Sequence, residues 1–310
     1  MSGAKASECE GVLILGAPRS GTTLLRRILD AHPNLACPGE TGVFRAAARF
    51  LERERTGVGV EVGVLAGLAH AGFSRDEVRS RTREFVMSFH REIAQRAGKK
   101  RWVEKNAFDA FHVSGIEELC GDSVAYICLV RHGLDVAASM LELCDKSQSF
   151  LLDFSEYISR ERRPLEAFSQ AWVDVNQALL GLVERRPRQA VLVNYEQLAA
   201  QPDRELDRLL HFLGEAPASG LIEKALSRTG SVGLGDWKTY GRRVIDTTSI
   251  GRWRSLPPAT QAAMGAIANP MLERLGYESV DTQALSSEEA QRRYELGLLL
   301  QAARAGKGQE

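Results

Sequence analysis

Residues 16 to 23 combine glycines, hydroxyl side chains and one cation, which are the residue types that bind phosphate. They follow the apolar run Val12 to Leu15 and lead into Thr22 to Ala31, where apolar residues recur at helical spacing. Between a strand and a helix, loop amides and the N-terminus of the helix converge on one point and favour an anion there. A plain glycine turn is the poorer interpretation, because hydroxyls are so dense. The segment consists of Gly16, Ala17, Pro18, Arg19, Ser20, Gly21, Thr22 and Thr23.

The loop departs from that of nucleotide triphosphatases at one position. The spacing of Gly16 and Gly21 and the hydroxyl of Thr23 agree with a Walker A loop, but the lysine that should follow the second glycine is Thr22. Since that lysine reaches the terminal phosphates of ATP, the sequence disfavours ATP hydrolysis. A P-loop kinase for small molecules and a non-catalytic nucleotide-binding protein of the same fold stay open as alternatives.

The segment Pro18 to Thr23 resembles the phosphosulfate-binding loop of sulfotransferases that use 3'-phosphoadenosine 5'-phosphosulfate (PAPS). In that family an arginine at the end of a core strand and a serine eight residues later hold the 3'-phosphate. Arg131 and Ser139 have this separation here and follow the apolar run Val124 to Val130. Arginine offers phosphate a planar fork, and Ser139 lies about two helical turns further on. The joint occurrence of two such distant motifs weighs more than either motif alone.

Two further segments extend the resemblance over roughly Val12 to Pro258. Tyr195 resembles a strand-end tyrosine that contacts the nucleotide, and residues 248–253 resemble a loop that places a glycine, a cation and a tryptophan over the 3'-phosphate. The resemblance implies a three-layer αβα fold with a central parallel sheet, the P-loop-NTPase-like sulfotransferase fold. It also implies PAPS as co-substrate, without a metal, bound by Arg19, Ser20, Gly21, Thr22, Thr23, Arg131, Ser139, Tyr195, Ser249, Gly251, Arg252 and Trp253.

The resemblance also implies which residues do the chemistry. Small-molecule sulfotransferases of the cytosol carry a lysine and, two residues later, a histidine base; here Lys105 is followed by Asn106 and Ala107. Residues 32–41 and 104–108 instead resemble tyrosylprotein sulfotransferases and their bacterial relatives, whose base is a glutamate. An ungapped alignment from Arg19 places that glutamate on Glu40. We therefore expect Glu40 as general base, Lys105 on the bridging oxygen and Arg19 beside the transferred group.

Plainer roles remain for each of these side chains. Glu40 could be an acid at the start of a helix, since Thr41 to Leu51 is helical in pattern, and Lys105 could be a solvated surface lysine. His112 and His132 are the other candidates for the base, although a packing or surface role is the more ordinary expectation for both.

The acceptor is expected to be a small molecule, a sugar or a lipid-like compound with a hydroxyl or an amine. Tyrosylprotein sulfotransferases place an arginine directly after the Glu-Thr pair to hold acidic peptides, whereas this chain has Gly42, with Arg45 as the nearest cation. Apolar segments near residues 41–75 and 143–165 are expected to supply the acceptor walls. The second segment is either a lid or an ordinary helix with a core face.

These residues must be positioned by alternating strands and helices in one domain of residues 1–310. Four apolar runs separated by helical stretches predict buried parallel strands joined by right-handed crossovers. The expected strands are Val12 to Leu15, Arg101 to Val103, Val124 to Val130 and Ala190 to Val193. The expected helices are Arg75 to Ala97, Leu134 to Leu143, Pro164 to Glu184, Pro202 to Leu213 and a C-terminal helix over residues 286–304, which packs on the body or on a second copy in a homodimer. Between them, Gly230 to Pro258 is expected to form a long irregular loop.

Composition excludes several other classes of protein. The chain has 310 residues, is 44% hydrophobic and carries 40 basic and 40 acidic side chains, so disorder is excluded and a nucleic-acid partner is disfavoured. No apolar run approaches the length of a membrane span. Five cysteines without a CxxC pair indicate neither a disulfide framework nor a zinc site and favour a reducing, cytoplasmic location.

Overall fold

The structure of the protein is a computed structural model. It describes residues 4–52, 54–150, 153–161, 163–227 and 244–283, together with Glu295 and Leu299. The chain divides into two compact units: the first comprises residues 1–131 and 174–247, and the second comprises residues 132–173 and 248–310. The assignment of residues 1–310 to a single domain stays a prediction.

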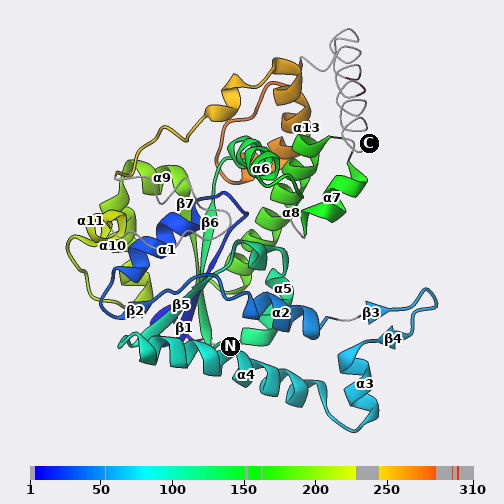
Figure 1. Ribbon diagram of the computed structural model, residues 1–310, viewed down its shortest axis with the longest axis vertical. Helices are drawn as coiled ribbons and strands as arrows, with labels where there is room; N and C mark the ends of the chain where they lie inside the picture. The colour runs from blue at the N-terminus through cyan, green and yellow to red at the C-terminus, as the bar shows by residue number, and fades with distance from the viewer. Residues whose placement is uncertain are drawn as a thin grey trace. The chain divides into compact units, whose positions relative to one another are not determined.

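A five-stranded parallel sheet forms the centre of the first unit (Figure 1). Its order is β2-β5-β1-β6-β7, and all four predicted strands are confirmed. The edge strand β2 was not predicted, because two residues are too few to show a period. The bounds are β1 Gly11–Leu15, β2 Leu35–Ala36, β5 Arg101–Lys105, β6 Val124–Val130 and β7 Ala190–Asn194.

Helices cover both faces of this sheet, as the buried strands require. Every residue of β1 and β6 is buried, because alternate side chains enter opposite layers. One layer contains α1 (Thr22–Asp30), α9 (Tyr195–Ala200), α10 (Pro202–Leu213) and α11 (Leu221–Ser227). The other contains α2 (Val43–Phe50), α4 (Arg75–Arg96) and α5 (Val113–Cys120) (Figure 1). The expected three-layer αβα architecture is therefore confirmed.

Several shorter elements complete the described chain. Those of the first unit are η1 (Ala6–Glu8), the antiparallel pair β3 (Glu54–Arg55) and β4 (Glu61–Val62), α3 (Val64–His70) and η2 (Ala107–Phe111). Those of the second unit are α6 (Gly133–Ser147), α7 (Phe154–Arg160), η3 (Arg252–Ser255) and α13 (Pro258–Arg274), while α8 (Pro164–Arg185) contributes to both units. The predicted helix over 286–304 lies outside the described residues apart from Glu295 and Leu299, and so do residues 230–243 of the predicted irregular loop. Among the helices described, none is long and apolar enough to cross a bilayer.

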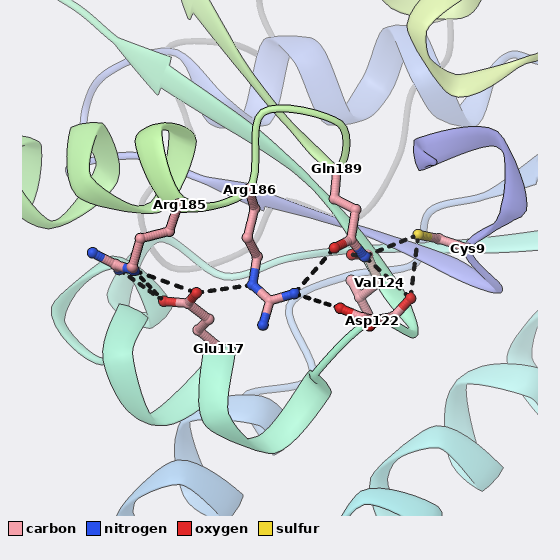
Figure 2. A network of polar contacts seen from close by, with 7 residues as sticks. All are labelled: Cys9, Glu117, Asp122, Val124, Arg185, Arg186 and Gln189. Atoms are coloured by element: carbon pink, nitrogen blue, oxygen red, sulfur yellow. Dashed lines mark hydrogen bonds and ion pairs between the residues drawn. The ribbon is translucent and has the colours of Figure 1, made fainter. Parts of the chain in front are cut away.

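A polar network joins the segments at the amino ends of β6 and β7 (Figure 2). Arg186 donates to Glu117 at 2.8 Å and to Asp122 at 2.7 Å. Buried Gln189 donates to the carbonyls of Asp122 and Val124 at 3.1 and 3.3 Å. This network fixes the start of the two strands, whereas the carboxyl ends, where parallel sheets hold their ligands, carry the predicted site.

Candidate active site

The loop after β1 has backbone conformations that few residues other than glycine adopt. Gly21 has a φ of 96°, and Arg19 has a φ of 74°, which a non-glycine residue seldom adopts. A Cβ on Gly16 would lie 2.6 Å from the carbonyl oxygen of Leu129 on β6, so only glycine fits there. The loop is therefore folded tightly against the neighbouring strand, with its following amides at the start of α1.

The loop offers a buried hydroxyl that has no partner within the described part of the chain. Ser20 is fully buried, and its Oγ makes no hydrogen bond there. A buried hydroxyl without a partner is costly, and an anion held by the loop would satisfy it. Because the open backbone of Gly21 and the start of α1 adjoin it, the loop fits the phosphosulfate group of a nucleotide.

Arg131 and Tyr195 complete one side of this loop. Arg131 Nη1 donates to the carbonyl of Arg19 at 3.0 Å, and its guanidinium lies 4.6 Å from the centre of the Tyr195 ring. A Cβ on Gly21 would be 2.4 Å from the Tyr195 ring, so the tyrosine packs directly on the loop. The structure thus brings together four predicted nucleotide-binding residues from the segments that follow β1, β6 and β7: Arg19, Gly21, Arg131 and Tyr195.

Lys105 joins the predicted base to the same loop. Its Nζ donates to Thr23 Oγ1 at 2.7 Å and forms a short ion pair with Glu40. Lys105 is 4% exposed, so the solvated surface lysine is wrong. Glu40 keeps 44% of its side chain exposed and lies ahead of the N-cap residue Gly42, outside the first turn of α2. The helix-start role for Glu40 is therefore wrong, and its carboxylate is accessible to a second molecule.

The sequence did not reveal a second carboxylate next to Lys105, that of Glu104. Glu104 precedes Lys105 on β5, and its Oε1 accepts the amide of Thr41 at 2.9 Å. Its other oxygen lies 3.3 Å from Nε2 of His90 on α4. The available signal was an acid and a lysine side by side at the end of a strand, since successive strand residues point to opposite faces.

Asp109 on η2 is a third carboxyl group in this region. It is 1% exposed, and burial together with the nearby charge of Glu104 raises its pKa well above the ordinary 3.8, against the effect of Arg45. The folded state therefore holds the proton of Asp109 more tightly than the unfolded chain does.

Removing this carboxyl should change how stability depends on pH. Below the ordinary pKa both states are protonated; as pH rises toward the raised pKa, only the unfolded chain loses its proton, and stability falls. Relative to Asp109→Asn, the wild-type free energy of unfolding should decline over this interval, with a slope of up to about 1.4 kcal/mol per pH unit. Denaturant unfolding of both proteins at a series of pH values measures it; parallel curves would contradict the assignment.

The second unit holds the remaining predicted nucleotide-binding residues. Asp135 on α6, which sequence reasoning missed, accepts the amides of Gly251 and Trp253 at 2.7 and 3.0 Å. The Trp253 ring stacks on His132, with 5.0 Å between ring centres and 9° between planes, and its buried indole N–H has no acceptor among the described residues. Asp135 and His132 thus fix the start of η3.

The second unit also holds Ser139, Ser249, Arg252 and part of the predicted lid segment. Ser139 on α6 and Ser249 are buried, and Arg252 forms an ion pair with Glu142. Phe154 in the predicted lid segment packs edge-on against Phe168, with 5.2 Å between ring centres, so this residue belongs to the core.

The histidine candidates for the base have different surroundings. His132 is held between the rings of Trp253 and Tyr277, which is a packing position. His112 is the N-cap residue of α5 and is half-buried.

The amino-acid sequence matches a known protein family and several known proteins. The model of the sulfotransferase family matches residues 11–218. Nodulation protein NoeE of Sinorhizobium fredii (strain NBRC 101917 / NGR234) is 27% identical over 281 residues, which cover 86% of this chain and 65% of NoeE. Protein-tyrosine sulfotransferase 1 of Danio rerio is 27% identical over 277 residues, which cover 86% of this chain and 72% of that protein.

A solved structure shows the same fold. The sulfotransferase domain from the curacin biosynthetic pathway superposes with a TM-score of 0.60 at 19% identity, over 87% of this chain and 99% of that domain. The family match spans more than half of the chain and includes β1, β5, β6 and β7. The chain therefore belongs to the sulfotransferase family of enzymes.

Proposed function

We propose that the chain transfers a sulfuryl group from PAPS to a hydroxyl or amine of a small molecule, a sugar or a lipid-like acceptor. The observation that carries this proposal is the placement of Lys105, which contacts both Glu40 and the loop residue Thr23. Three separate segments thereby bring together the Glu40 carboxylate, the Lys105 ammonium and the loop after β1. Sulfuryl transfer needs these three groups: a base, a cation for the leaving oxygen, and a cradle for the donor.

Glu40 would act on the acceptor. The acceptor oxygen or nitrogen forms a bond to sulfur as the bond between sulfur and the 5'-phosphate oxygen breaks, in line, and the acceptor proton passes to the Glu40 carboxylate. The partial exposure of Glu40 supports this role, because the acceptor must reach its oxygen. The products are the sulfated acceptor and 3'-phosphoadenosine 5'-phosphate (PAP).

Lys105 would act on the leaving oxygen of the donor, and Arg19 would lie beside the transferred group. The negative charge that develops on the leaving phosphate oxygen is stabilised by the buried Lys105 ammonium, while loop amides and the hydroxyls of Ser20 and Thr23 hold the remaining oxygens. Arg131 and Tyr195 adjoin the loop and would bind the nucleotide. That Ser139, Ser249, Gly251, Arg252 and Trp253 also bind the nucleotide is a further part of the proposal.

In this proposal, protein groups alone neutralise the charge that develops on the leaving phosphate oxygen. We therefore expect sulfuryl transfer to continue in EDTA at the rate measured without it, because Lys105, Arg19 and loop amides occupy the role that Mg²⁺ has in phosphoryl transfer. Initial rates with and without chelator measure this. A rate abolished by EDTA and restored by Mg²⁺ would contradict the proposal and favour a kinase.

The acceptor class can be tested directly with the full chain. PAPS would be offered with phenols, sugar alcohols, lipid-like alcohols, amines and a tyrosine peptide with acidic flanks, and each product examined for the mass of one added sulfuryl group. We expect a non-peptide acceptor to be sulfated fastest. The tyrosine peptide as fastest substrate would overturn the acceptor class and leave sulfuryl transfer itself standing.

A further inference from the structure

A buried polar pair lies directly behind Glu40 and Lys105. The side chains of His90 and Glu104 are both 0% exposed, and His90 Nε2 lies 3.3 Å from Glu104 Oε2. His90 is enclosed by the rings of Phe44 and Trp102, whose centres lie 4.8 and 4.9 Å from that of its imidazole. Phe44, which the sequence placed in an acceptor wall, is thus a core residue.

The contacts of the imidazole fix where its protons are. His90 Nδ1 lies 2.9 Å from the carbonyl oxygen of Val86, which can only accept, so Nδ1 carries a hydrogen. One further proton lies between Nε2 and Glu104 Oε2, because a lone pair on nitrogen and a carboxylate oxygen would otherwise repel each other. A hydrogen bond therefore joins His90 to Glu104.

The other oxygen of Glu104 reaches the segment that carries the proposed base. Oε1 accepts the amide of Thr41 at 2.9 Å, and Thr41 directly follows Glu40. Glu104 directly precedes Lys105, which contacts Glu40 from the same strand. Two successive residues of β5 thus hold two successive residues of the loop, one through a side chain and one through a backbone amide.

Stability alone gives little reason for such a pair in this place. Buried ion pairs cost desolvation, and well-packed apolar side chains of similar volume are often at least as stabilising. Asp109 is a further cost, since Glu104 raises the pKa of its carboxyl. A backbone amide can be held at a defined point by a fixed acceptor, which an apolar side chain cannot provide.

We propose that His90 and Glu104 are a positioning pair for the catalytic groups. Glu104 holds the Thr41 amide and thereby the backbone of Glu40, while His90 fixes the orientation of the Glu104 carboxyl. The charged or titratable groups near this pair include Lys105, which follows Glu104 on β5, and Asp109, which interacts electrostatically with Glu104, Arg45 and Glu40. This inference rests on the proposed function, in which Glu40 is the base.

The test compares two substitutions of Glu104. Gln keeps an acceptor for Thr41 and a donor for the unprotonated Nε2 of His90, whereas Met keeps the length and removes both. We expect Glu104→Met to lose about 10- to 100-fold in kcat, since a misplacement of about 1 Å can cost 10²-fold. The affinity of Glu104→Met for PAP and its KM for PAPS should stay near the wild-type values. Glu104→Gln should keep most of the wild-type kcat.

A matched control separates positioning from general damage to the core. Gln189 is also buried and polar, but its contacts lie at the amino ends of the strands (Figure 2). Gln189→Met should lower the free energy of unfolding and leave kcat unchanged. If Glu104→Met and Gln189→Met lower kcat equally, the positioning role is wrong.

A measurement on the wild-type protein keeps the inference testable if Glu104→Met does not fold. Thr41 lies outside any helix or strand, so its amide should exchange with solvent quickly unless Glu104 holds it. We expect hydrogen exchange at Thr41 to be slow by NMR, to be slow in Glu104→Gln and to become fast in Glu104→Met. Fast exchange in the wild type would overturn the positioning pair.

Failure of this inference can be told apart from failure of the proposed function. If Glu40→Gln abolishes turnover while Glu104→Met retains the wild-type kcat, the positioning pair is wrong and Glu40 remains the base. If Glu40→Gln turns over normally, the base assignment is wrong. The pair then has no catalytic base to position, whatever the exchange rate of the Thr41 amide.

Discussion

Glu40→Gln is expected to bind PAP with wild-type affinity and to lose turnover by about 10²- to 10⁴-fold, the usual contribution of a positioned general base. Glutamine keeps the size of the side chain and a contact to Lys105 but cannot take the acceptor proton. The fall of kcat/KM at acidic pH, which reports protonation of the base, should disappear in this variant. Calorimetry with PAP and a pH series of initial rates measure both expectations.

The two histidines serve as controls for this assignment. His112→Ala and His132→Ala should each cost much less turnover than Glu40→Gln, since His112 begins a helix and His132 is held between two aromatic rings. Normal turnover of Glu40→Gln together with an inactive histidine variant would reassign the base to that histidine.

Arg131→Ala should weaken the binding of PAP at least tenfold. A charge-assisted hydrogen bond contributes about 1.5 to 3 kcal/mol, and about 1.4 kcal/mol corresponds to a factor of ten in Kd. The substitution also removes the contact to the Arg19 carbonyl and the packing on Tyr195, which shape the loop. Wild-type protein should bind PAP far more tightly than ADP or ATP.

The control for this prediction is an arginine of the same unit that lies elsewhere. Arg185 pairs with Glu117 at the amino ends of the strands (Figure 2), so Arg185→Ala should leave the affinity for PAP unchanged. Equal affinities of the wild-type protein for PAP and ADP would contradict a 3'-phosphate site and favour the small-molecule kinase.

The sequence was sufficient for the parts of the fold that have a strong local pattern. The helix from Pro202 to Leu213 has the predicted bounds, because a proline at its start and Gly214 after its end mark both termini. The strand from Val124 to Val130 is also as predicted, since a long apolar run in a parallel sheet is buried on both faces.

Other parts depend on tertiary contacts that no local pattern encodes. The edge strand Leu35–Ala36 exists because Arg101 and Trp102 pair with it. His90 and Glu104 lie in separate elements, and only the packing of α4 on the sheet brings them together. Asp135 had no visible reason to matter until the structure placed the amides of Gly251 and Trp253 against it.

The sequence pointed to individual residues of the candidate site, but not to the contacts between them. Lys105 and Glu40 were chosen from a resemblance, whereas their ion pair and the bond from Lys105 to Thr23 are visible only in the structure. Burial decided the competing role of Lys105, because a surface lysine is solvated and this one is enclosed.

One measurement tests the central claim most directly: incubation of the purified full chain with either PAPS or ATP, in EDTA and in Mg²⁺, against the same acceptor panel. The account predicts an acceptor that gains the mass of one sulfuryl group with PAPS, in EDTA as in Mg²⁺, with stoichiometric release of PAP. It also predicts that Glu40→Gln forms this product at least about 10²-fold more slowly. Phosphorylated acceptor from ATP that requires Mg²⁺, with no sulfated product from PAPS, would contradict it.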